Sequence, residues 1–307
     1  MAVPSGAMGM PEGVGVVDPM IGFPSGGAGR YEGIRAMTRD AESKEMAFPA
    51  EYMFRQVPNH LPEGADPVAI TLGEMDRCGI AVGVIGDPYR EVSGRALREH
   101  PARFVSSLSV DPNDGVGAVR RIRQAKDEHD IKAVTSFPAG CNPQVPISDR
   151  RYYPIFQTCA ELDLPIVLNA GVPGPRVPGA CQDVEHFDRV CYDFPELRVV
   201  MRHGAEPQED LAVKLMLKWP GLHYMTSGFA PRYYPEAIIR YANTRGADKV
   251  MYAGYYPMGL SLRRIFDELP AVPLKDEVWP RFLRDNARRV FGLGDGASAG
   301  AGGGDPV

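Results

Sequence analysis

The sequence has no long hydrophobic run, no basic excess and no cysteine pattern that indicates a metal or disulfide framework. No apolar stretch approaches the roughly 20 residues that span a bilayer, so we expect no membrane segment. The 307 residues carry a formal net charge of −5 without any basic run, which argues against a nucleic-acid surface. The five cysteines are odd in number and scattered, which is typical of reduced thiols.

The first ten residues contain neither the basic region nor the apolar core of a signal peptide, so we expect a cytoplasmic protein. Hydrophobic residues make up 44% and charged residues 24% of the chain, as in soluble globular proteins. The length fits one α/β barrel or two average domains. We predict disordered tails at 1–13 and 294–307, which are rich in Gly, Ala and Pro.

Between these tails, over 14–293, short apolar runs alternate with helical patterns, and a loop-rich insertion occupies about 21–66. Eight runs are predicted strands: 15–19, 80–86, 104–110, 131–136, 165–171, 197–203, 221–227 and 249–257. Strands separated by helices favour a parallel sheet, and eight of them close a (β/α)8 TIM barrel. A doubly wound open sheet is the alternative, but no Gly-x-Gly-x-x-Gly motif opens a helix.

The run 197–207 is the strand of greatest interest for function. It is apolar and β-branched, and it delivers Arg202 and His203 into a loop that Gly204 and Pro207 break. Active sites of α/β barrels lie at the carboxyl ends of the strands. Neighbouring residues of a strand point to opposite faces, so Arg202 and His203 need not both face the cavity.

Several phrases of the chain resemble the amidohydrolase-related proteins of the aminocarboxymuconate-semialdehyde decarboxylase type. The resemblance covers about 15–293, and its phrases are MDRCGI at 75–80, HPARFV at 100–105, DFPELRVV at 193–200 before His203, DKVMY at 248–252 and FLRDNARRVF at 282–291. These phrases imply a (β/α)8 barrel of the metal-dependent-hydrolase type. They support a hydrolase or decarboxylase activity less directly than they support the fold.

The same resemblance implies a divalent metal site, and this sequence departs from it at most ligand positions. Met20 and Gly22 stand where the family has a His-x-His, Asn169 where it has a histidine, and Tyr255 where it has an aspartate; His203 matches. A catalytic zinc ion needs about three imidazole or carboxylate ligands and an open position for water. We therefore expect no metal ion and no other cofactor.

Three residues are candidate catalytic groups. His203 is the candidate acid–base group, or else a histidine of the barrel mouth held by hydrogen bonds. Asn169 is placed to polarise a substrate carbonyl, or else bonds to backbone within the core. Asp18 is placed to accept a proton or to orient Asn169, or else serves as a turn residue before Pro19.

Three further residues are candidate substrate contacts. Arg202 and Arg176 offer guanidinium groups for a carboxylate, and Tyr255 stands at the end of the last strand. The alternative for Arg176 is simple packing of its proline-rich loop. The phenol of Tyr255, with an ordinary pKa of about 10, is a poor substitute for a carboxylate base.

Two functions follow. The first is a metal-independent enzyme, lactonase-like or a decarboxylase, that acts on a small carboxylated cyclic compound. The second is a catalytically inactive barrel that serves as a partner or accessory subunit of an active paralogue or another enzyme complex. We expect a homo-oligomer, or a hetero-oligomer with a related barrel.

Overall fold

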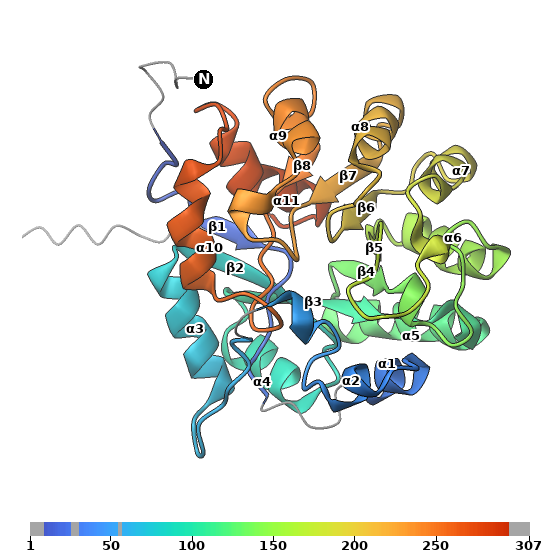
Figure 1. Ribbon diagram of the computed structural model, residues 1–307, viewed down its shortest axis with the longest axis horizontal. Helices are drawn as coiled ribbons and strands as arrows, with labels where there is room; N and C mark the ends of the chain where they lie inside the picture. Colours follow the sequence, from blue (N-terminus) through green and yellow to red (C-terminus); the bar gives the residue numbers. More distant parts are fainter. Residues whose placement is uncertain (1–8, 26–30, 55–56, 295–307) are drawn as a thin grey trace, which may run out of the picture.

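The computed structural model describes residues 9–25, 31–54 and 57–294, and a curled sheet of eight parallel strands lies at its centre (Figure 1). The strands pair in sequence order from first to last. They are β1 (Val16–Asp18), β2 (Ile80–Ile85), β3 (Phe104–Ser109), β4 (Ala133–Ser136), β5 (Ile166–Asn169), β6 (Val199–Arg202), β7 (Leu222–Met225) and β8 (Val250–Met251). The predicted (β/α)8 architecture is confirmed.

Helices alternate with these strands and surround them, as Figure 1 shows. They are α3 (Pro67–Arg77), α4 (Glu91–Glu99), α5 (Val116–His129), α6 (Tyr153–Glu161), α7 (His186–Asp193), α8 (Glu209–Lys218), α9 (Glu236–Ala242), α10 (Leu262–Glu268) and α11 (Asn286–Val290). No helix in the described part of the chain is both long and apolar enough to cross a membrane. Most of the predicted tails lie outside the described residues.

The local sequence explains how a typical helix of the ring begins and packs. Asp66 caps α3 by accepting a hydrogen bond from the amide of Val68, and Pro67 occupies the first turn. The buried residues Val68, Thr71 and Met75 recur every three or four positions and form one face. That face packs on the sheet, while the opposite face meets solvent.

Alternate residues of the strands divide the core into two layers. One layer lies between strands and helices. The other lies inside the barrel, and its buried members are Val17, Val84, Ala133, Val167, Val200, Met225, Met251, Ala253, Ala287, Val290 and Phe291. The last three of these come from α11 and its end, so the C-terminal helix closes the floor of the barrel. The opening is therefore at the carboxyl ends of the strands.

No strand ladder joins β8 to β1 among the described residues, and other bonds close the sheet there. The carboxylate of Asp18 accepts a hydrogen bond from the amide of Gly254 at 2.9 Å. The Gly22 amide donates to the carbonyl of Tyr256, also at 2.9 Å. A π-helical segment, η8 (Arg281–Asp285), lies against both strands. We call this junction the seam.

The insertion after β1 contains helices that the sequence did not indicate: α1 (Glu32–Met37), α2 (Ala41–Glu45) and the single turn η1 (Glu51–Met53). Each is one or two turns long, too short for a hydrophobic period to stand out. Asp40 caps α2 by accepting from the amide of Ser43 at 2.9 Å. We call residues 31–54 the strap, because its side chains contact loops that follow β5 and β8.

Candidate active site at the barrel mouth

Arg202 ends β6 and points into the barrel mouth. Its neighbours in register are Asn169 on β5 and Met225 on β7, and Met225 belongs to the interior layer. The Arg202 side chain lines a cavity of about 730 Å³ that opens among the loops at the carboxyl ends of β1, β2 and β8. Of the two adjacent candidates, Arg202 is therefore the one that faces this cavity.

The cavity has a hydroxyl-bearing wall, an apolar wall and a charged group of side chains. The charged group, which lies between β2 and the start of α4, consists of Asp87, Arg90 and Glu91. The hydroxyl groups come from the interior-facing sides of β3 and β4, and the apolar side chains come from β7 and from the loops after β1 and β8. The residues concerned are Ser107, Ser109 and Thr135 for the first wall, and Met20, Phe23, Met225 and Met258 for the second. Apolar cavities with a few polar groups are typical of sites for small molecules.

Arg202 forms no ion pair with a carboxylate among the described residues, although Asp87 and Glu91 line the same cavity. Its Nε donates a hydrogen bond to Oδ1 of Asn169. Burial lowers the pKa of Arg202 to about 10, so the guanidinium keeps its proton at neutral pH. Arg202 is half-buried, so its unpaired charge is partly desolvated, and an anion in the cavity would relieve that cost.

His203 has a different environment, although it is the next residue. Its backbone is left-handed, with φ of 67°, and Gly204 and Ala205 also have positive φ. This turn carries the imidazole away from the cavity that Arg202 lines. The Nδ1 atom lies 3.1 Å from the hydroxyl of Ser227. Burial, followed by the charge of Arg202, lowers the pKa of His203 to about 3, so the ring is neutral at pH 7.

Aromatic rings pack around His203. The ring of Tyr255 meets it edge to face, with centroids 5.1 Å apart. Two strap residues, Phe48 and Phe54, pack in turn against Tyr255 at 6.3 and 5.8 Å. Tyr255 thus joins His203 to the strap and does not line the Arg202 cavity.

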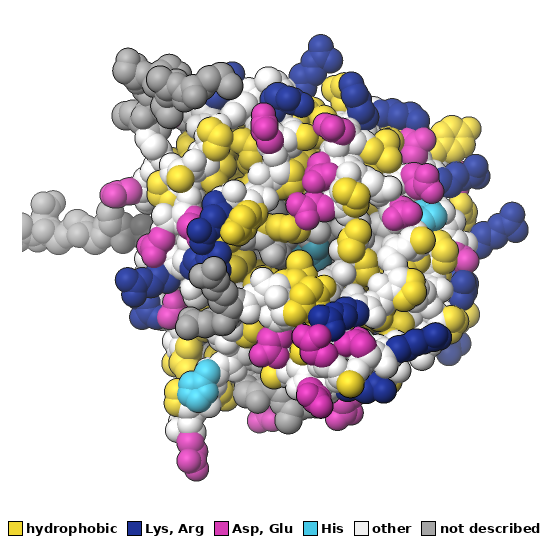
Figure 2. Space-filling model, viewed as in Figure 1, with side chains coloured by type: hydrophobic (Ala, Val, Ile, Leu, Met, Phe, Trp, Pro, Cys, Tyr) yellow, Lys and Arg dark blue, Asp and Glu magenta, His cyan; other side chains and the backbone are white. Residues whose placement is uncertain are grey.

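Arg176 lies at the surface, where it holds the strap to the loop after β5. Its Nη1 binds carboxylate oxygens of Asp40 at 2.9 Å and Glu42 at 2.8 Å, and its guanidinium lies 4.8 Å from the ring centre of Tyr52. Figure 2 shows acidic side chains gathered over the region of α1 and α2. With two carboxylate partners, Arg176 is already neutralised, and the structure does not bring it to the mouth cavity.

Asp18 is fully buried at the seam and does not line the cavity. Its Oδ1 accepts hydrogen bonds from the amides of Met20 and Gly254, and its Oδ2 accepts one from the hydroxyl of Tyr252. Burial raises the pKa of Asp18 above its ordinary value. The structure therefore brings Arg202 and Asn169 into contact and places Asp18 apart from them.

The hydroxyl wall is the part of the site that sequence reasoning missed. Ser107 and Ser109 are two apart on β3, and Ser109 pairs in register with Thr135 on β4. A period of two on neighbouring strands does indicate one shared face. The signal was available, but serine and threonine in a strand do not by themselves indicate a ligand.

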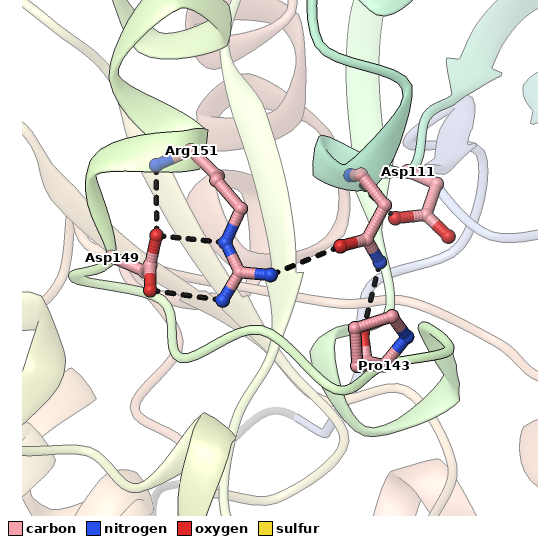
Figure 3. Close-up of polar contacts among 5 residues, drawn as sticks. Asp111, Pro143, Asp149 and Arg151 are labelled. Atoms are coloured by element: carbon pink, nitrogen blue, oxygen red, sulfur yellow. Dashed lines mark hydrogen bonds and ion pairs between the residues drawn. The ribbon is translucent and has the colours of Figure 1, made fainter.

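A polar network joins the loops that follow β3 and β4 (Figure 3). Arg151 binds both oxygens of Asp149, and its Nη1 donates to Oδ1 of Asn113 at 3.1 Å. Asn113 also donates through Nδ2 to the carbonyl of Pro143 and through its amide to Asp111, both at 2.8 Å. These bonds fix the two loops above the strands that carry the hydroxyl wall.

The side chains at the mouth do not fit a divalent metal ion. Among the described residues, no three His, Cys, Asp or Glu side chains gather as a ligand set. Met20 would supply a thioether, and the Asn169 oxygen is already bonded to Arg202. A catalytic zinc site takes about three imidazole, thiolate or carboxylate ligands. Moreover, the positive charge of Arg202 would repel a cation at this end of the barrel.

The chain belongs to the amidohydrolase family, whose family model matches residues 36–293. No curated protein matches it in sequence. Among solved structures, it is similar to an uncharacterized TIM-barrel protein from Bordetella bronchiseptica, with 22% identity, a TM-score of 0.70, and coverage of 90% of this chain and 98% of that one.

Two further solved structures are decarboxylases. 2,6-Dihydroxybenzoate decarboxylase from Rhizobium is 15% identical, with a TM-score of 0.60 and coverage of 91% of this chain and 99% of that one. A dihydroxybenzoic acid decarboxylase from Polaromonas, solved with bound manganese and 2-nitroresorcinol, is 15% identical, with a TM-score of 0.61 and coverage of 91% and 97%. At these identities the likeness concerns the fold.

Proposed function

We propose that this chain is a metal-independent enzyme, a decarboxylase or a lactonase-like hydrolase, that acts on a small carboxylated cyclic compound. The observation that carries the proposal is the half-buried guanidinium of Arg202, which lines the mouth cavity and forms no ion pair with a carboxylate among the described residues. Membership of the amidohydrolase family and the likeness to decarboxylases of carboxylated aromatics support the same substrate class.

Arg202 binds the substrate carboxylate. Its Nε is engaged by Asn169, which fixes the plane of the guanidinium and leaves the two terminal nitrogens for a ligand. Arginine binds carboxylates through two parallel hydrogen bonds, and such charge-assisted bonds are stronger than neutral ones. Asn169 is next to Arg202 in register, and its oxygen is held by Arg202, so its amide nitrogen is the group that would donate to a carbonyl of the same ligand.

His203 is the proposed acid–base group. Its ring turns away from the cavity that Arg202 lines, so this role requires the imidazole to turn toward the bound ligand. In the free protein its pKa of about 3 makes it a weak base at neutral pH. A carboxylate on Arg202 offsets the positive charge that is the second cause of the low value, so the pKa rises. In hydrolysis the neutral imidazole takes a proton from the attacking water. In decarboxylation the imidazolium gives its proton to the ring carbon as the carboxylate leaves as carbon dioxide.

The proposal is tested by incubating the purified, chelator-treated protein with two sets of compounds. Hydroxybenzoates such as 2,6-dihydroxybenzoate report carbon dioxide release, and carboxylated cyclic lactones report ring opening. We expect turnover in one set, unchanged by chelator and abolished in R202M. Turnover that needs added manganese or zinc would contradict metal independence.

One observation favours the second candidate, a non-catalytic partner barrel: the rings of Tyr255 and the strap pack around His203. In that case the protein binds the carboxylates without turning them over, and it co-purifies from its native source with a related barrel. The incubation and a pull-down together separate these two functions.

A further inference from the structure

Asp18 is a buried carboxylate that the proposed chemistry does not use. Its exposed fraction is 0%, and both oxygens are occupied. Oδ1 accepts from the Met20 amide at 3.0 Å and from the Gly254 amide at 2.9 Å, and Oδ2 accepts from the Tyr252 hydroxyl at 3.3 Å. A carboxylate that is shielded from the cavity and fully bonded cannot exchange a proton directly with a ligand there.

The partners of Asp18 belong to opposite sides of the seam. The Met20 amide lies in the loop after β1, and the Met20 side chain lines the Arg202 cavity. The Gly254 amide lies after β8 and directly precedes Tyr255, whose ring packs on His203. One carboxylate therefore ties the wall of the cavity to the group that contacts the imidazole.

Gly254 provides the space for this junction. A Cβ atom added to Gly254 would lie 2.5 Å from Oδ2 of Asp18 and 3.1 Å from the Tyr252 hydroxyl, and both are buried. No flexible chain end is there to move aside. The close approach of the β8 backbone to Asp18 thus requires glycine, because any larger residue would force the two strands apart.

We propose that Asp18 is a positioning residue that sets the register of the β1 and β8 loops, and thereby the placement of Met20 and Tyr255 on either side of the active site. Its effect on turnover rests on the function proposed above, whereas its effect on the seam does not. A positioning role needs the hydrogen-bond acceptor of the side chain, not its charge.

Substitution of Asp18 by asparagine or alanine separates the need for a hydrogen-bond acceptor from the need for a negative charge. D18N keeps an Oδ1 atom that accepts from both amides, so we expect the seam to stay intact. D18A removes the acceptor and leaves the buried amides of Met20 and Gly254 without a partner. G254A is the second disrupting variant, since it keeps the carboxylate and displaces it by steric contact. S136A, which loses a buried hydroxyl on β4, is the control for general destabilisation.

The first readout is independent of activity: the rate at which diethyl pyrocarbonate modifies His203, measured by peptide mass spectrometry, with His129 on α5 as the internal reference. We expect the rate in D18A and G254A to differ at least threefold from that of the wild type, and the rates in D18N and S136A to match it. Hydrogen exchange at Met20 and Gly254 should accelerate in D18A and G254A alone.

The second readout is turnover of the carboxylate identified by the incubation above. D18N should retain most of the wild-type kcat/KM, and D18A should lose at least tenfold. If D18N is as inactive as D18A while its seam amides stay protected, Asp18 acts through its charge and the proposal is overturned. It is also overturned if His203 modification is the same in all variants.

If the wild type turns over no tested carboxylate, the proposed function fails and the labelling result still decides the role of Asp18.

Discussion

Arg202 and His203 are adjacent in the chain and occupy opposite environments. Arg202 faces an open cavity of about 730 Å³ and forms no ion pair among the described residues. His203 turns away from that cavity and packs against Tyr255. One side of the mouth thus offers a cation to a ligand, and the other keeps an imidazole neutral. The contrast shows that a positive-φ turn at a strand end can separate two neighbouring functional groups.

The largest expected effect comes from removing the cation. R202M should weaken binding of a carboxylate ligand about 10- to 100-fold, because a charge-assisted pair is worth roughly 1.5–3 kcal/mol. Its folded state should be no less stable than the wild type, since an unpaired, half-buried charge is removed. Isothermal titration and urea unfolding measure the two quantities.

The matched control is R176M. It removes an arginine whose partners are the strap carboxylates of Asp40 and Glu42. Carboxylate affinity should change less than about twofold, because exposed ion pairs contribute little. A large loss of affinity in R176M would show that the surface arginine, rather than Arg202, holds the ligand.

The next effect concerns the imidazole. H203Q should lower kcat about 100-fold, within the range of general acid–base catalysis, and leave the dissociation constant of the ligand within about threefold. Steady-state kinetics and direct titration check the two halves separately. An H203Q protein that is fully active would leave His203 with only a packing role beside Tyr255.

A smaller effect links the two residues electrostatically. Burial, followed by the charge of Arg202, holds the pKa of His203 at about 3. In R202M the positive charge beside the ring is gone, so the pKa of His203 should rise toward its ordinary value. A carboxylate bound to Arg202 should raise the pKa of His203 in the wild type for the same reason. NMR titration of the His203 ring measures both. An unchanged pKa in R202M would mean that burial alone determines it.

The smallest effect lies at the seam. Burial raises the pKa of Asp18, so the folded protein holds this proton more tightly than the unfolded chain does. As the pH rises from the unfolded value of 3.8 to the raised folded pKa, the unfolded chain releases this proton before the folded protein does, so stability falls across that window and stays lower above it. The free energy of unfolding of D18N, relative to wild type, should thus improve as the pH rises from about 3.5 to 7. Urea unfolding at both values checks this, and a difference that falls with pH would contradict it.

The strands and their order were predictable because parallel strands that are buried on both faces have continuous apolar sequences, as in Val199, Val200 and Met201 of β6. The directions in which the Arg202 and His203 side chains point were not predictable from the sequence. The left-handed backbone at His203 and Ala205 leaves no residue-type signature, since neither is glycine. The position of Arg176 was not predictable either, because its partners Asp40 and Glu42 lie more than 130 positions away in the chain.

The most direct test of the account is a titration of wild-type protein and R202M with 2,6-dihydroxybenzoate in chelator-treated buffer. We expect binding to the wild type without added metal and binding at least tenfold weaker to R202M. Equal affinity in the two proteins, or binding that appears only with manganese, would contradict the claim that Arg202 supplies the positive charge of this site.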